Sequence, residues 1–516
     1  MDEHTIGRRW FTLERLTIPA LTAISLLAYA GLVSVHFTNN TLTHQHLPQT
    51  MRWFYLAFVA YGLTIYWTER QYHRGKTPIS PRYLWGGAIL FHVLLLFTVP
   101  TLSSDVYRYL WDGYVANNGV SPYAFPIDSP QLDYLDAPIR AQANHTWMAS
   151  PYLPAAQTLF GTVTWLLPPT PLSMQIALVG VNLFNGILIV ALLSIANLPC
   201  HRVLIYLWNP LVIVEIAQGA HIDGWMTLLA LLAVWAAMAG LSGSESISGC
   251  LPERRATARK TFTFGDSPLM GIFPEGGYPF LQNWLSPILL ALATLTKIIP
   301  GFLMVVLFWH WQSWARWRAI ALYLITIAVL IVNAGMRGGW GLVGELDGHG
   351  LFAALRIYGD RWNFNSGLFH WLEVGLMNDA LLGLSLEDAN QWAKRIVALL
   401  LLTVLFTVWL YTRKQTSPRA MLRLMAVPLM GYVLLTTTFH PWYLLMLLAF
   451  VPFLPPAQDE PAVGWLDVMP WLYLSSALFL SYFTYFDPQD LREYEWIRRT
   501  EWLPTLGLLL VSRLRK

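Results

Sequence analysis

Long apolar runs recur along almost the whole sequence and set the first limit on its fold. The chain has 516 residues, of which 55% are hydrophobic and only 12% are charged. Soluble domains carry roughly 25% charged residues, and a helix needs about 20 apolar residues to cross a bilayer. We therefore predict an all-α polytopic membrane protein with about 14 transmembrane or half-membrane helices.

The apolar pattern also divides the chain. We predict three parts, namely an N-terminal membrane hairpin at 1–82, a membrane core at 83–456 that contains the polar clusters discussed below, and C-terminal membrane helices at 457–516. Polar segments interrupt the core. They predict a large first outer loop at 103–153, a flexible cytoplasmic linker at 242–283 and a further outer loop at 335–393.

Basic residues assign the two faces of the membrane. If the apolar segment 154–168 lies in the outer leaflet and both termini are cytoplasmic, most Lys and Arg residues fall on the inner side, as the positive-inside rule requires. Cys200 and Cys250 then face the reducing side, so no disulfide is expected. The polar clusters collect on the outer side, which indicates a functional site there.

The most informative cluster is SSDVYRYLWDGYVANNGVSPY at 103–123, directly after an apolar span. Ionisable groups at a membrane boundary are costly to hold and usually mark function. Asp105 and Asp112 are seven residues apart, so a helix places them on one face with Arg108 between them. Both carboxylates are catalytic candidates, and helix capping with an ion-pair ladder is the structural alternative.

Two further segments combine charge with apolar surroundings. His221 and Asp223 lie in the turn QGAHIDG between two apolar spans, where a merely water-facing turn is the alternative. Lys297 interrupts an apolar stretch, and Pro300 breaks the helix beside it. A lysine there either extends to the membrane interface or holds a lipid-linked phosphate.

Aromatic and amide residues make up the last two clusters. The segment TTTFHPWY contains His440, Trp442 and Tyr443, which can bind phosphate, transfer a proton or stack on a sugar. The aromatic belt of a membrane protein is the alternative. In the outer loop, Asn365 belongs to RWNFNSGLFHWLE, whose amides and indoles suit sugar hydroxyls and sugar faces.

Other functions lack a motif. The sequence has no Walker loop and no Gly-rich dinucleotide motif, so neither a nucleotide site nor a nucleic-acid partner is indicated. Carboxylates seven residues apart on a helix stand about 10 Å apart, too far to share one ion. We assign no metal site, although Asp105 remains a candidate ligand for Mg²⁺ or Mn²⁺.

The ordered blocks resemble the C-type (GT-C) membrane glycosyltransferase superfamily. The blocks are DVYRYLWDG, SPYLPAAQTLF, WNPLVIVEIAQGAHIDGWM, LTKIIP, RWNFNSGLF and FHPWYLL. They are most similar to those of bacterial polyprenyl-phosphate-mannose-dependent mannosyltransferases and of the GPI mannosyltransferase catalytic subunit. The chain departs from the family with Tyr-Leu-Pro at 152–154 and Ala-His-Ile-Asp at 220–223, where Tyr-Pro-Pro and Gly-His-Asn-Asp are common.

The resemblance implies an inverting transfer of a hexose, first of all mannose, from a polyprenyl-phosphate-linked donor to a lipid or glycan acceptor on the extracytoplasmic face. Asp105 is then the base, with Asp112 as second choice. The residues implied in binding the donor phosphate or sugar are Arg108, Lys297, His440, His221, Asp223, Trp442, Tyr443 and Asn365. The expected location is a bacterial plasma membrane, among membrane lipids.

Two other functions and one other location stay open. A lipid-linked glycan flippase or transporter also has many spans with charged groups. An envelope glycan ligase or polymerase uses a lipid-pyrophosphate donor, for which Arg337, Arg356 and Arg361 are candidate ligands. An endoplasmic reticulum membrane is the other location, because Asn39 and Asn144 begin glycosylation sequons on the outer side.

Overall fold

Helices form the framework of the computed structural model. The structure describes residues 3–39, 46–135, 137–238, 280–311, 315–341, 349–456, 462–486 and 492–515. Within these ranges it contains no strand, only an isolated parallel bridge between Phe364 and Thr438. The all-helical prediction is therefore confirmed for this part of the chain.

The α-helices are α1 (Glu3–Asn39), α2 (Leu47–His73), α3 (Pro81–Leu95), α4 (Asp105–Asn117), α5 (Pro154–Leu166), α6 (Pro171–Ile195), α7 (Leu204–Leu207), α8 (Pro210–Ile213), α9 (Asp223–Met238), α11 (Ser286–Thr294), α12 (Met304–His310), α13 (Arg316–Gly338), α14 (Ala353–Arg361), α15 (Leu368–Met377), α16 (Leu386–Thr412), α17 (Pro418–Leu435), α18 (Leu445–Phe450), α19 (Met469–Ala477) and α20 (Glu495–Leu514). Short 3-10 and π segments extend or join several of them.

Five described helices are long and apolar enough to cross a membrane. They are residues Leu16–Phe37 of α1, and α6, α13, α16 and α17. A sixth span results if the pair Cys200–Leu207 and Pro210–Gln218, bent by 58°, is counted as one. The larger count of about 14 is not confirmed, because several apolar runs fold into shorter helices of 10–17 residues.

Two of the long helices leave their apolar side chains uncovered. Only 11% of the most apolar window of α13 and 17% of that of α16 are buried. Exposed apolar surfaces of this size are rare on soluble proteins but suit contact with lipid tails. These helices support the assignment of the chain as a membrane protein.

The interior is built around α9, which packs against α6, α11 and α18. Nearly all side chains of α9 are buried. Beside it, the chain breaks between α7 and α8, where Asn209 caps the backbone N–H of Leu211 at 3.0 Å and Pro210 occupies the first turn. A π-helical segment, Val214–Gln218, follows directly, and such segments are frequent at functional sites.

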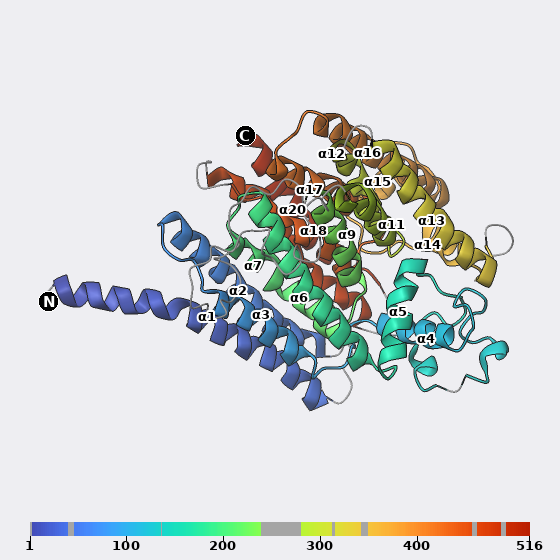
Figure 1. The fold of residues 1–516 in the computed structure, drawn as a ribbon, viewed down its shortest axis with the longest axis horizontal. Coiled ribbons are helices and arrows are strands. Elements are labelled where there is room, and N and C mark those ends of the chain that lie inside the picture. Colours follow the sequence, from blue (N-terminus) through green and yellow to red (C-terminus); the bar gives the residue numbers. More distant parts are fainter. Residues whose placement is uncertain are drawn as a thin grey trace.

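The segment 103–153, predicted as the first outer loop, contains α4, which lies beside α5 at one edge of the molecule (Figure 1). Gly113 allows this close approach, because a Cβ there would lie 2.4 Å from the backbone oxygen of Phe160. The 13 residues of α5 extend only about 20 Å. Because the hydrocarbon layer is about 30 Å thick, α5 alone is too short to cross it.

The expectations for the inner face are tested only in part. Most of the predicted linker at 242–283 lies outside the described residues, which resume at 280. Cys200 is disulfide-bonded, so the expectation of a reduced thiol is wrong for this residue, and Cys250 lies outside the described residues. Because disulfides persist mainly in oxidising compartments, the cytoplasmic placement of this face rests on charge alone and stays a prediction.

Candidate active site

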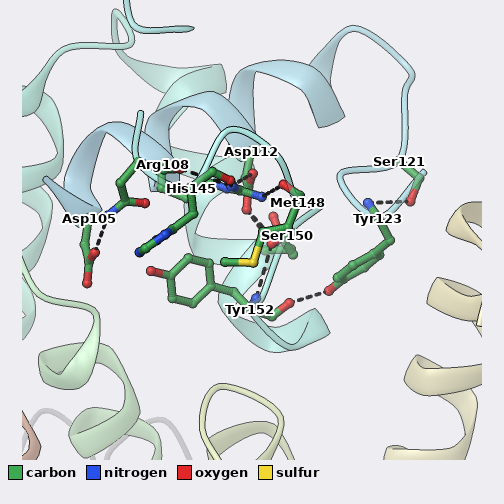
Figure 2. Close-up of polar contacts among 11 residues, drawn as sticks. Asp105, Arg108, Asp112, Ser121, Tyr123, His145, Met148, Ser150 and Tyr152 are labelled. Carbon is green, nitrogen blue, oxygen red and sulfur yellow. Dashed lines mark hydrogen bonds and ion pairs between the residues drawn. The ribbon is translucent and has the colours of Figure 1, made fainter. Parts of the chain in front are cut away.

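Asp105 begins α4 and lies apart from the other charged residues of this helix (Figure 2). Its backbone N–H donates to Ser103 Oγ at 3.2 Å, and Asn144 Nδ2 donates to its Oδ1 at 2.8 Å. The side chain is partly buried. This burial raises the pKa of Asp105, and the hydrogen bond from Asn144 and the charge of Lys297 offset the rise only in part. A carboxylate in this environment is a stronger proton acceptor than a free Asp.

Arg108 and Asp112 form a buried ion pair further along α4, with exposed fractions of only 1% and 2%. Arg108 Nε donates to Asp112 Oδ1 at 3.1 Å, and its terminal nitrogens donate to three carbonyl groups in the loop at 144–148. Asp112 also accepts from Ser150 Oγ and, at 3.1 Å, from Gln157 Nε2. The pair thus fixes the loop that carries Asn144 to Asp105.

Lys297 follows α11 and is held by a buried carboxylate at the start of α9. Its Nζ lies 2.6 Å and 2.8 Å from the two carboxylate oxygens of Asp223 and 4.5 Å from the ring centroid of Tyr443. Asp223 is fully buried, whereas the Lys297 side chain is 18% exposed. An ammonium group has three N–H donors, so one remains for a ligand after both contacts to Asp223.

Four aromatic rings stack and join three distant segments of the chain. His221 lies 3.8 Å from Trp442, Trp442 lies 4.5 Å from His440, and His440 lies 4.5 Å from Phe364, measured between ring centroids. All three pairs are within 19° of parallel. We call these four residues the ring stack. The structure therefore brings together three predicted site residues and adds Phe364.

A second set of aromatic contacts connects the Asp105 loop with the surroundings of Lys297. Trp362 contacts the His145 ring at 4.9 Å and stacks on Tyr358 at 5.2 Å. The hydroxyl groups of Tyr358 and Tyr443 are 2.6 Å apart, and Tyr443 lies under Lys297. Segments that are far apart in the sequence therefore border one site.

Glu215 belongs to this site but was not assigned from the sequence. It lies in the π segment, is fully buried, and accepts a hydrogen bond from Tyr482 Oη at 2.8 Å. One of its oxygens is 3.2 Å from His221 Nε2. A carboxylate inside an apolar run is itself a functional signal, whereas nothing in the sequence distinguishes Tyr482 from other membrane tyrosines.

Asn365 takes part in a different network. Its Nδ2 donates to Glu501 Oε2 at 2.7 Å, its backbone N–H donates to Glu493 Oε2 at 3.0 Å, and its carbonyl accepts from Trp502 Nε1. Its φ of 48° places it in a left-handed turn. These contacts attach the turn to the C-terminal helix α20, and none of them joins Asn365 to Asp105 or Lys297.

The described residues include no group of three or more His, Cys, Asp or Glu side chains that could hold a metal ion. The contact of Asp105 with Asn144 is to an amide donor, which favours an ionised, hydrogen-bonded carboxylate. The role of Asp105 as a metal ligand stays a prediction.

Comparison with known proteins supports an enzymatic site. No curated protein matches the chain by sequence. Residues 17–315 match the family model described as "Alpha-(1->6)-mannopyranosyltransferase, N-terminal domain", which covers more than half of the 516 residues. The match includes Asp105, Asp223 and Lys297 and ends before His440. The chain therefore belongs to this family of mannosyltransferases.

Proposed function

We propose that this protein transfers mannose from a polyprenyl-phosphate-linked donor to an acceptor hydroxyl on the extracytoplasmic face of the membrane, with inversion at the anomeric carbon. Membership of the family supports mannosyl transfer. The observation that carries the rest is the series of side-chain contacts that links the Asp105 loop to Lys297. It runs from His145 through Trp362, Tyr358 and Tyr443 to the amine of Lys297, so that a carboxylate and a cation border one site. Transfer from a lipid phosphate needs both a proton acceptor and a cation.

In this mechanism Asp105 accepts the proton of the attacking hydroxyl, whose oxygen bonds to the anomeric carbon. The bond from this carbon to the phosphate oxygen breaks on the opposite side, and the lipid phosphate leaves with the electron pair. Lys297 offsets the negative charge on the departing phosphate. Following the linkage in the family description, we assign the attacking hydroxyl to carbon 6 of a mannose.

The remaining predicted residues receive supporting roles. Asp112 and Arg108 position the loop of Asn144, because their charges are paired and buried. Trp442 stacks on both His221 and His440. Because its ring is already occupied by these contacts, we assign it to the wall of the site rather than to sugar stacking. Asp223 holds Lys297 in place.

The direct test is incubation of the purified protein with labelled polyprenyl-phosphate mannose and envelope lipid extracts. We expect label in a new product in which the anomeric carbon of the added mannose is α-linked to the oxygen on carbon 6 of the acceptor mannose. Labelling from a nucleotide-linked mannose instead would exclude the lipid donor. Movement of a lipid-linked glycan across vesicles without a new glycosidic bond would favour a flippase.

Removing the charge of Lys297 should weaken donor binding more than it slows saturated turnover. We expect Lys297→Gln, combined with Asp223→Asn so that no buried carboxylate is left unpaired, to raise the donor KM while kcat changes less. Steady-state kinetics with the labelled donor measure both quantities. Lys394→Gln is the control, because Lys394 is a half-buried lysine of α16 whose Nζ donates to the carbonyl groups of Gly359 and Asp360 and not to Asp223. A fall in kcat at unchanged KM would contradict phosphate binding by Lys297.

Loss of the Asn144 amide should move the pH dependence of the reaction. Asn144 donates to Asp105 and lowers its pKa, so Asn144→Ala should raise this pKa further. Because the base must be deprotonated, the acid limb of the kcat/KM profile should shift to higher pH, while the rate at the plateau changes less. Asn118→Ala, at the other end of α4, should leave the limb in place. An unmoved limb in Asn144→Ala would show that Asp105 does not set it.

A further inference from the structure

A cavity of about 540 Å³ lies beside the ring stack. Its volume falls in the range of roughly 300–1,000 Å³ typical of small-ligand sites. It is lined by residues between 363 and 373, by Thr484 and Tyr485, and by Glu493 and Arg498. Phe364 belongs both to this lining and to the ring stack, so the cavity shares a wall with the candidate active site.

Among the described lining residues there is one arginine, Arg498, and its positive charge is already paired with carboxylates of the protein. Arg498 Nε donates to the carbonyl of Ser366 at 3.1 Å, Nη1 donates to Glu495 Oε2 at 2.7 Å, and Nη2 donates to Glu493. The guanidinium thus faces two carboxylates and a carbonyl. Three of its five N–H donors are engaged and its charge is compensated.

The other ionisable groups of the lining also disfavour an anion. Glu373 and Glu493 are both acidic, and burial, with the nearby charge of Arg498, lowers the pKa of His370, so this imidazole is neutral at pH 7. A phosphate group placed here would face uncompensated negative charge. Carboxylates accept hydrogen bonds from hydroxyl groups, however, so an uncharged polyhydroxylated ligand is well matched.

Several polar groups of the lining are available to such a ligand. Across the described ranges, the side chains of Asn363, Ser366 and Thr484 form no hydrogen bond to protein. Glu373 Oε1 accepts a hydrogen bond from Asn390 Nδ2 at 2.6 Å. The other carboxylate oxygen, Oε2, can accept a hydrogen bond from a ligand. Together with the aromatic ring of Phe364, these donors and acceptors provide the mixed polar and flat apolar surface that a sugar ring requires.

The cavity also lies close to the reacting groups. Trp362, the residue before Asn363, contacts His145 of the Asp105 loop. Tyr485 lines the cavity, and its ring centroid lies 5.9 Å from that of Phe364 in the ring stack. A ligand in the cavity can therefore extend toward the candidate base.

We infer that this cavity binds the acceptor as an uncharged chain of hexoses, with the reacting end of the glycan directed to Asp105. The acceptor role rests on the proposed function, whereas glycan binding does not. The cavity thereby selects the acceptor by its neutral sugar chain and not by an anionic lipid headgroup.

The test measures binding of a neutral α-(1->6)-linked mannose tetrasaccharide to the full-length protein without donor. We expect Thr484→Val combined with Asn363→Ala to weaken binding about tenfold, as the loss of one or two hydrogen bonds predicts. Glu373→Gln is a second lining variant and should act in the same direction. Glu387→Gln is the control, because Glu387 is exposed on α16 and lies outside the lining. In steady-state kinetics, the acceptor KM should rise in the lining variants while the donor KM stays constant.

Two results would overturn the inference. One is unchanged affinity for the tetrasaccharide in all lining variants. The other is tighter binding of a phosphorylated tetrasaccharide than of the neutral one, since the lining should repel it. If the neutral glycan binds and the variants lose it, but polyprenyl-phosphate mannose supports no transfer, then the glycan site stands and the proposed function fails.

Discussion

Asp105→Asn should reduce mannosyl transfer by about 10²–10⁴-fold, which is the usual contribution of a general base. Asn has nearly the same shape and can keep a hydrogen bond to Asn144, so the variant should fold and enter the membrane as the wild type does. Its amide accepts no proton at any working pH. Initial rates with saturating labelled donor and acceptor measure the effect.

The matched control for this variant is Asp128→Asn. Asp128 is an exposed carboxylate of the same outer loop, so it carries the same charge change without access to the site. We expect its rate to stay near that of the wild type. If Asp105→Asn turned over like the wild type, the base would have to be another group, and Asp112 or Glu215 would be examined next.

Arg108→Ala should destabilise the fold by about 3–5 kcal/mol, because it leaves a buried carboxylate without its partner. Asp112 is almost fully buried beside Arg108, and three carbonyls of the loop at 144–148 lose their donor as well. Thermal unfolding of the purified protein in detergent measures the loss. Activity should fall with it, because this loop carries Asn144 to Asp105.

A double variant distinguishes the cost of an unpaired buried charge from the cost of lost side-chain packing. Arg108→Met with Asp112→Asn removes both charges and should recover part of the stability lost in Arg108→Ala. Arg337→Ala, at an exposed position near the end of α13, should change stability little. Equal melting temperatures for Arg108→Ala and the wild type would mean that the buried pair contributes nothing to holding the loop.

Apolar composition predicted the helical class, whereas the count of about 14 transmembrane or half-membrane helices is not confirmed for the described residues. The reason is visible at the breaks. Pro210 begins a new helix after Leu207, and Pro300 and Pro441 lie in 3-10 turns that precede the short helices α12 and α18. Hydrophobicity predicts which residues avoid water. The length of each helix also depends on where proline interrupts the backbone hydrogen bonds.

The sequence located the polar clusters of the site but not their pairing. Asp105, Lys297 and His440 were expected together from the order of the blocks, yet the partners that hold them come from other clusters. Asp223 binds Lys297, and Phe364 covers His440. Such contacts depend on tertiary packing, which helical periodicity does not encode.

Asn365 is a further residue whose contacts the sequence did not predict. Its neighbours Trp362 and Asn363 made a sugar-binding segment plausible, but its amide is bonded to Glu501, 136 residues later. The segment itself still borders the cavity. Local composition thus pointed to a segment that borders a cavity, and the contacts within this segment became known only from the structure.

The ring stack has a consequence for the order of events during synthesis. His221 is translated long before Trp442, which covers its imidazole in the finished protein, and chains enter the membrane from the N-terminus onward. A nascent polypeptide inserted only through α9 carries Asp105 but leaves this imidazole open to water or lipid. Under the proposed mechanism, the wall of the site is therefore complete only after the segment that contains Trp442 has left the ribosome and been inserted.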